Sequence, residues 1–189
     1  MLESDLIASA RQGEGAGWEA LVHQHQEAVF RLAYLLVGDA DDAQDVAQEA
    51  FVRAYRAMDR FDPDRPLRPW LLSITANLAR NRRRSVARYL AAAQRLALGA
   101  PEPERMASVE GESLQKIEAQ TLWQAVRQLN PADQQVIYLR FFLELPEAEM
   151  AGALAVASGT VKSRLHRALK RLRTVIEDEF PTLQDKFSP

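Results

Sequence analysis

The stretch SGTVKSRLHRALKRLR, residues 158–173, has six lysines and arginines among its sixteen residues and no acid, although the chain's formal net charge is −2. At about 100° per residue, its apolar positions fall on one helical face and every cation lies outside that face. The apolar face comprises Val161, Leu165, Ala168, Leu169, Leu172 and, just downstream, Ile176. The stretch therefore predicts an amphipathic helix with a cationic outer surface.

A second short helix is predicted over residues 146–154, and Ala155, Val156 and Ala157 form the turn between the two helices. Ser158 is expected to be the N-cap of the cationic helix. Two short helices joined in this way are typical of a helix-turn-helix unit, whose second helix enters the major groove of DNA. A solvated surface helix is the alternative, but such helices normally mix charge signs. Duplex DNA binding is favoured, since the cations can replace counterions on phosphate and polar side chains near the helix start can reach base edges.

Composition excludes several other classes of protein. The 189 residues are 47% hydrophobic and 26% charged, which indicates a globular chain. The absence of cysteine excludes a disulfide framework, a thiolate zinc site and a cysteine nucleophile. The sequence shows no secretory signal, membrane span, metal-ligand pattern or catalytic motif. We expect a cytosolic, non-enzymatic protein with no metal and no cofactor.

Apolar residues recur at three- and four-residue spacing almost throughout, so an all-α fold is predicted. Glycines and prolines divide the chain, and blocks of opposite charge follow one another along it. The expected order is an N-terminal segment over 1–17, a helical bundle over 18–88, a flexible linker over 89–113, a smaller helical bundle over 114–177 and a tail over 178–189. Leu139, Phe141 and Phe142 are expected in the core of the smaller bundle.

Three segments together resemble a known family. Residues 129–173, which include GTVKSRLHRA, are similar to region 4 of bacterial extracytoplasmic-function (ECF) σ factors, members of the sigma-70 family. DDAQDVAQEAFVRAYRAMDRFD, residues 41–62, resembles regions 2.1–2.2 of the same family, and RPWLLSITANLARNRRRS, residues 68–85, resembles regions 2.3–2.4. The matches occur in the family's order and spacing. They imply a σ factor that directs core RNA polymerase to promoters, with a region 2 bundle and a region 4 helix-turn-helix joined by the linker.

The resemblance assigns a polymerase-binding face to the first of the region 2 segments. On a helix over residues 41–57, small and apolar residues form one stripe and acids cluster opposite it. These acids could instead complement the helix N-terminus, and Glu49 could pair with Arg53. The resemblance implies that this face docks on the clamp helices of the β′ subunit of core polymerase. The β subunit of core polymerase is also an expected partner of the chain. The expected contacts are Asp42, Asp45, Gln48, Glu49 and Val52.

The second segment is expected to open the promoter −10 element. A stiff loop over residues 61–69 should precede a helix beginning at Trp70, with Trp70 itself in the core. Arg80, Arg82, Arg83 and Arg84 lie toward the end of this helix. They could simply interact favourably with the negative end of the helix dipole, but there are more of them than a cap requires. The family resemblance implies that a flipped single-stranded base is held by edge hydrogen bonds and stacking. The expected contacts are Asp64, Arg65, Pro66, Leu67, Asn77, Arg80, Asn81, Arg82, Arg83 and Arg84.

For the −35 element, the resemblance implies duplex contacts from the cationic helix, at Ser158, Thr160, Lys162, Ser163, Arg164, His166, Arg167 and Lys170. It also implies an anti-σ factor as a partner, which could use apolar residues exposed on two loosely tethered domains.

This chain departs from the family's usual sequence in the turn of the helix-turn-helix, where the family commonly has glycine and this chain has Ala155.

Other classes of protein remain as alternatives. A stand-alone helix-turn-helix regulator would leave the arginine run at 80–84 unexplained. A metal-dependent nuclease would need converging carboxylates, and an anti-σ or adaptor protein would lack the two basic surfaces.

Overall fold

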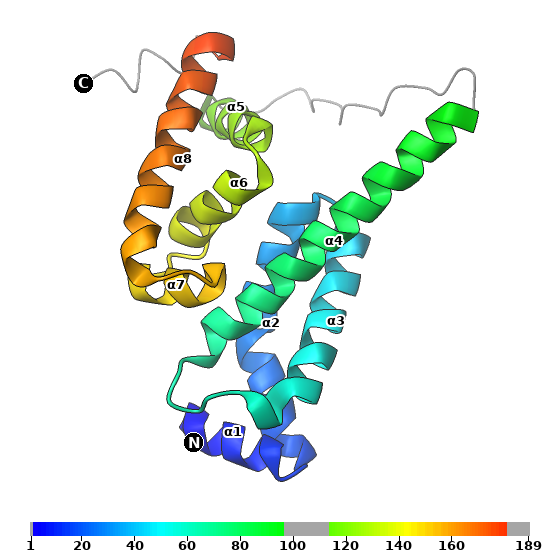
Figure 1. The fold of residues 1–189 in the computed structure, drawn as a ribbon, viewed down its shortest axis with the longest axis vertical. Helices are drawn as coiled ribbons and strands as arrows, with labels where there is room; N and C mark the ends of the chain where they lie inside the picture. Colours follow the sequence, from blue (N-terminus) through cyan, green and yellow to red (C-terminus); the bar gives the residue numbers. More distant parts are fainter. Residues whose placement is uncertain (1, 97–113, 181–189) are drawn as a thin grey trace.

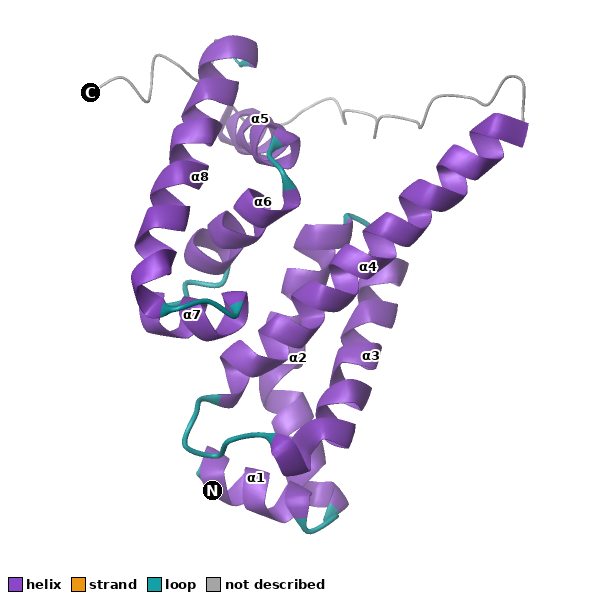
Figure 2. Ribbon diagram, in the orientation of Figure 1, coloured by secondary structure: helices purple, strands orange, loops and turns teal. Residues whose placement is uncertain are grey.

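The computed structural model describes residues 2–96 and 114–180, which form helices and no β-strand. The first domain consists of α1 (Glu3–Arg11), α2 (Gly15–Val37), α3 (Ala40–Ala57), the 3-10 helix η1 (Met58–Arg60) and α4 (Leu67–Leu96). The second consists of α5 (Leu114–Gln128), α6 (Pro131–Ile137), the π-helix η2 (Tyr138–Phe142), α7 (Glu147–Leu154) and α8 (Ser158–Glu179). The predicted all-α, two-domain fold is confirmed (Figure 1, Figure 2).

The first domain is a bundle in which α2, α3 and α4 pack on one another. Gly38 ends α2 in the left-handed region, at φ +84°, and donates its N–H to the Tyr34 carbonyl at 2.8 Å. Asp39 then caps α3 by accepting the N–H of Asp42 at 2.9 Å. Glycine and aspartate thus permit a two-residue turn that folds α3 back along α2.

Helix α1 belongs to this bundle, so the bundle begins earlier than the expected boundary at residue 18. Leu6, Ile7 and Ala10 of α1 are buried, and α1 packs along α2. The Nε2 of buried His25 lies 2.9 Å from Glu3 Oε1. Burial lowers the pKa of His25, and Glu3 opposes that shift. At the other end of the bundle, α4 continues to Leu96, into the expected linker, whose residues 97–113 lie outside the described part of the chain.

The second domain closes α8 over α6 and α7. Trp123 stacks on Tyr138, with ring centroids 5.4 Å apart, and Phe142 meets both rings edge-on. Leu139 is fully buried, as expected, but Phe141 is 55% exposed. The expectation of a core role for Phe141 is therefore wrong, because Tyr138 and Phe142 take the inward side of η2.

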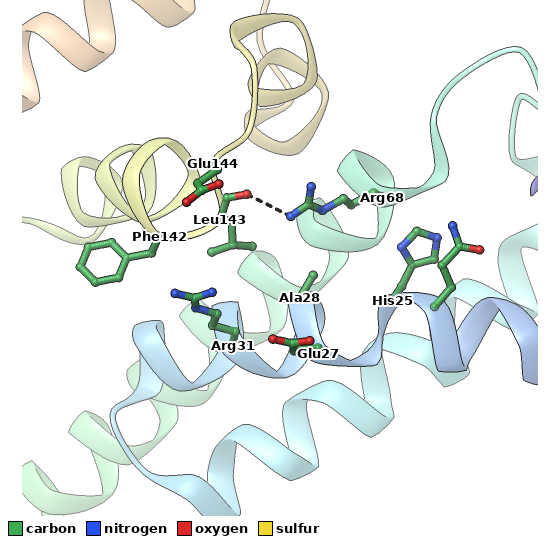
Figure 3. A pocket seen from close by; sticks show the side chains of 9 residues that line it. His25, Glu27, Ala28, Arg31, Arg68, Phe142, Leu143 and Glu144 are labelled. Carbon is green, nitrogen blue, oxygen red and sulfur yellow. Dashed lines mark hydrogen bonds between the residues drawn. The ribbon is translucent and has the colours of Figure 1, made fainter.

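The two domains contact one another. Helix α7 packs against the start of α4, where a Cβ on Gly152 would come within 3.1 Å of the Pro69 side chain. Arg68 donates to the Leu143 carbonyl at 3.0 Å (Figure 3). Farther along α4, Arg83 donates to Gln134 at 3.0 Å. The expectation of two loosely tethered domains is corrected, since hydrogen bonds and close packing join them.

We predict that Gly152→Leu separates the domains. Its side chain would overlap Pro69 and weaken the contact by about 1–3 kcal/mol, the usual effect of overpacking. Small-angle scattering of the purified chain should give a larger radius of gyration for this variant. Gly159→Leu is the matched control, since a Cβ at Gly159 meets nothing within 4 Å. Equal radii for Gly152→Leu and the wild type would contradict the prediction.

Candidate nucleic-acid and protein interfaces

The turn before α8 differs in detail from the expected one. Ala157 occupies the N-cap position with no side-chain cap, and Ser158 is the first residue of the helix. The Thr160 N–H bonds to the Ala157 carbonyl at 2.9 Å, so the backbone closes the first turn. Upstream, Pro146 is the N-cap of α7, and Ala155 ends that helix at φ +51°. The expected N-cap role of Ser158 is therefore wrong, and its side chain is exposed at the helix start.

Two of the six cations in the basic stretch are paired within the chain. Arg171 lies 3.0 Å from the largely buried Asp133 carboxylate and ties α8 to α6, whereas Arg173 pairs with Glu177 at 2.7 Å. No acid in the described part of the structure pairs with the other four, which are Lys162, Arg164, Arg167 and Lys170. These four are the cations expected to contact the −35 element.

The remaining expected −35 contacts lie on the same helix. Ser158, Ser163 and His166 are exposed, and Thr160 is half-buried. The apolar face is narrower than the sequence indicated, since Val161, Ala168, Leu172 and Ile176 are buried whereas Leu169 is 38% exposed. The outer surface of α8 thus combines unpaired cations with one apolar side chain.

The arginine run on α4 is engaged in local interactions. Arg80 bonds to Asn77, and Arg84 donates to Asn81 Oδ1 at 3.3 Å. Arg82 Nε donates to Asp42 Oδ1 at 2.9 Å, which raises the pKa of Arg82 above its ordinary value. With Arg83 on Gln134, all four arginines have an acceptor from the chain itself. Each guanidinium also has N–H donors that these acceptors leave free.

The loop before α4 is built around Asp62. One carboxylate oxygen of Asp62 accepts the N–H of Asp64 at 3.2 Å, and the other accepts Arg65 Nε at 3.1 Å. Asp64, Arg65 and Pro66 are exposed, as a base-binding role requires. Leu67, in contrast, is fully buried and begins α4, three residues before the expected start at Trp70. Leu67 therefore anchors the loop in the core and is not available to contact a base.

The structure does not bring the loop and the asparagines into one pocket. Asn77 lies ten residues after Leu67 on α4, which corresponds to about 15 Å along the helix axis. Asn77, Arg80, Asn81 and Arg84 follow one another at helical spacing and form a strip on one side of α4. The expected −10 contacts therefore form a loop at the start of the helix and a separate strip farther along it.

The acidic face of α3 is only partly free. Asp45, Gln48 and Val52 are exposed, whereas Glu49 pairs with Arg53 at 2.7 Å. Asp42 is held by Arg82, so its carboxylate already has a partner within the chain. Tyr55 was not among the expected contacts; it is 47% exposed and packs on Trp18 with ring centroids 5.2 Å apart. It lies three residues after exposed Val52, so the two side chains are neighbours on α3.

Two clefts adjoin these surfaces. One, between α3 and α4, is lined by Asp45 and Glu49 on one side and by Asn81, Arg82 and Arg88 on the other. The residues expected to contact polymerase and those expected to contact the −10 element are therefore neighbours. The second cleft lies between the domains, with a volume of about 440 Å³ (Figure 3). Its lining combines Arg31 and Arg68 with Glu27 and Glu144, so its charge favours neither an anion nor a cation.

Among the described residues, no cluster of histidines and acids could hold a metal ion. None of the helices in this part of the chain is long and apolar enough to cross a membrane.

Comparisons with known proteins match both domains. The family model for Sigma-70 region 2 matches residues 21–89, and that for Sigma-70, region 4 matches residues 119–172. ECF RNA polymerase sigma factor BldN of Streptomyces coelicolor is 32% identical over 176 residues, which cover 93% of this chain and 66% of BldN. ECF RNA polymerase sigma factor SigL of Mycobacterium tuberculosis is 31% identical over 173 residues, which cover 91% of this chain and 96% of SigL.

The fold also matches a solved structure. CnrH in complex with the cytosolic domain of CnrY has a TM-score of 0.67 and 24% identity, over 94% of this chain and 98% of CnrH. A helical region 2 domain together with a region 4 helix-turn-helix defines a promoter-recognition subunit of RNA polymerase. The chain belongs to the ECF σ factors of the sigma-70 family. It directs core RNA polymerase to specific promoters, and nothing in the comparisons supports a stand-alone regulator.

The turn of the helix-turn-helix gives a prediction about stability. Ala155 has a left-handed backbone, which costs an alanine about 1–2 kcal/mol and glycine almost nothing. Because glycine is also freer in the unfolded chain, we expect Ala155→Gly to raise the free energy of unfolding by about 0.5–1 kcal/mol. Urea unfolding measures this change. Ala157→Gly is the control, because φ −64° at Ala157 suits alanine. A loss of stability in Ala155→Gly would contradict the prediction.

Proposed function

We propose that this σ factor divides its work among three surfaces. The −35 duplex is contacted by Thr160, Lys162, Arg164, Arg167, Lys170 and the exposed polar residues Ser158, Ser163 and His166. Support comes from the charges of α8, where these four cations have no acidic partner in the described residues. That is the observation on which the proposal mainly rests, because a cation left unpaired within the chain is available to phosphate and to base edges.

For the −10 element, we propose that single-stranded DNA runs along α4. The exposed loop residues Asp64, Arg65 and Pro66 take the flipped base, and the strip from Asn77 to Arg84 contacts the strand farther along. Arg80 and Arg84 would exchange their asparagine acceptors for phosphates, which form stronger, charge-assisted hydrogen bonds. Arg82 and Arg83 would contact the strand through N–H groups that Asp42 and Gln134 leave free.

Core polymerase is proposed to bind the outer face of α3, at Asp45, Gln48, Glu49 and Val52, with Tyr55 extending the face by one turn. Exposed apolar and acidic side chains at helical spacing support this assignment. Asp42 has a different proposed role, which is to hold Arg82 and so fix α3 against α4.

The remaining proposals concern organisation and partners. Region 2 is assigned to α1–α4, region 4 to α5–α8 and the linker to the residues between them. The chain acts without catalysis of its own, in the bacterial cytoplasm where core polymerase is found. An anti-σ factor is proposed to hold the free chain; CnrH, which has the same fold, was solved with the cytosolic domain of CnrY.

Charge reversal on α8 tests the −35 assignment. With Arg164→Glu/Arg167→Glu, holoenzyme affinity for duplex fragments of the chain's own upstream region should fall by about 30-fold or more, since each such contact contributes about 1–3 kcal/mol. Affinity for core polymerase should not change. Fluorescence anisotropy measures both, and Arg173→Glu, at an ion-paired position on the same helix, is the control. Equal losses of DNA and polymerase binding would mean either that the variant is misfolded or that α8 does not bind DNA separately from polymerase.

The converse pair of substitutions tests the α3 face. Asp45→Lys/Glu49→Lys should weaken binding to core polymerase by about tenfold or more, because it places like charges across a complementary interface. Glu19→Lys/Asp59→Lys makes the same change in net charge at exposed acids on other elements. Titration with labelled core polymerase gives the affinities, and an unchanged affinity for the first variant would remove these residues from the interface.

A further inference from the structure

Arg11, at the end of α1, is bonded to the segment that leads into the proposed −10 loop. Its Nε donates to the Met58 carbonyl at 3.2 Å, and its Nη2 donates to the Phe61 carbonyl. These partners lie 47 and 50 residues away in the sequence. Helix α1 and the loop before α4 lie at the same end of the molecule (Figure 1, Figure 2).

The two carbonyls are those at which the loop leaves the bundle. Met58 begins η1 and Phe61 is its C-cap, and the Phe61 N–H also bonds to the Met58 carbonyl, at 3.1 Å. The Phe61 side chain is buried against Trp70, with centroids 4.7 Å apart. Arg11 therefore fixes the loop's backbone at the point where Phe61 fixes its side chain.

The rest of the loop depends on that attachment. Asp62 organises Asp64 and Arg65 through hydrogen bonds within the loop itself, and Leu67 anchors the far end. Between Phe61 and Leu67, the described structure gives no side-chain hydrogen bond from the loop to the bundle. The orientation of the exposed tip therefore follows from its two ends, of which Arg11 holds one.

Arginine is suited to this role. Its planar guanidinium presents several N–H donors in a rigid fork, so one side chain can hold two carbonyls at a fixed separation. The half-buried Arg11 is itself placed by α1, whose Leu6, Ile7 and Ala10 are buried in the bundle. Helix α1 thus connects the core of region 2 to the start of the loop.

We infer that Arg11 is a positioning residue for −10 recognition: by holding the Met58 and Phe61 carbonyls, it sets the orientation in which Asp64, Arg65 and Pro66 meet the flipped base. This inference rests on the proposed role of the loop in base recognition. It also gives α1 a function, since the helix carries the Arg11 guanidinium that orients the loop.

A merely structural role for Arg11 predicts a different result. If Arg11 only fastened α1, its loss would lower stability, or weaken binding to all promoters equally, as the loss of a phosphate contact does. A positioning role predicts that base preference is relaxed at the position that the loop contacts, with overall binding less affected. The ratio of affinities for different bases separates the two.

The test uses the full chain with Arg11→Ala and Arg11→Lys. Lysine keeps the charge but lacks the planar fork, so its effect should be intermediate. Arg60→Ala is the matched control, because exposed Arg60 adjoins the loop and has no side-chain hydrogen bond or ion pair among the described residues. Asp64→Ala/Arg65→Ala removes the proposed base contacts themselves.

Two readouts are taken. Hydrogen–deuterium exchange of the free chain reports the protection of the backbone N–H groups of residues 58–62, 64 and 65. Holoenzymes reconstituted with core polymerase are also incubated with a duplex promoter library randomised at the −10 positions, and the bound fragments are sequenced. We expect Arg11→Ala to speed exchange in the loop and to reduce discrimination at one −10 position by about tenfold, the usual contribution of a single good base contact. Arg60→Ala should leave both unchanged.

The outcomes separate this inference from the function on which it rests. Unchanged exchange in Arg11→Ala would overturn positioning by Arg11. Faster exchange with unchanged base preference would overturn its link to recognition, provided that Asp64→Ala/Arg65→Ala does relax the preference. If that loop variant has no effect either, the proposed role of the loop in base recognition is wrong, and so is the inference, although Arg11 still anchors the loop. Equal effects of Arg60→Ala would show that loss of charge, not position, is responsible.

Discussion

The close packing of α3 along α4 is the constraint on which the surfaces of region 2 depend. Helix α3 buries alanine at positions 43, 47, 50 and 54, and α4 buries Ala76 and Ala79. Small side chains let helix backbones approach closely, since the distance between axes is set by the residues at the contact. Asp42 of α3 reaches Arg82 of α4 across this contact, and the ion pair adds a polar link between the two helices.

One consequence is that residues proposed to bind polymerase and residues proposed to bind DNA line the same cleft. Asp45 and Glu49 form one wall, and Asn81, Arg82 and Arg88 form the other. Acids on α3 lower the local positive potential of the arginine strip, and Arg82 in turn neutralises part of the acidic face. With the proposed assignments, binding of either partner would change the electrostatic environment of the other, because the two surfaces lie on adjacent helices.

A second consequence concerns the hydrogen-bond partners of the arginines on α4. Asparagine, aspartate and glutamine acceptors hold Arg80, Arg82, Arg83 and Arg84 in the free chain, and Arg83 uses an acceptor from region 4. These partners hold the arginines in place, and the N–H groups that they leave free are the ones that the proposed contact offers to phosphate. The cations on α8 differ, because Lys162, Arg164, Arg167 and Lys170 have no acid to release in the described structure. The two basic surfaces therefore differ in charge pairing, because Arg82 of α4 is paired with an acid and these four cations of α8 are not.

The sequence by itself determined the helical class, the helix-turn-helix and the basic surface of α8, because helical periodicity and local charge are properties of neighbouring residues. It did not reveal that Leu67 is buried, that Phe141 is exposed, that α1 joins the bundle or that Arg11 holds the loop. It also missed the contact between the domains through Arg68 and Arg83. Each of these depends on which surfaces meet. The hydrogen bonds concerned join residues about 50 to 75 positions apart, and no local pattern encodes such a pairing. Tertiary packing alone decided them, because burial and hydrogen-bond partners are set by the neighbours that the folded chain brings together.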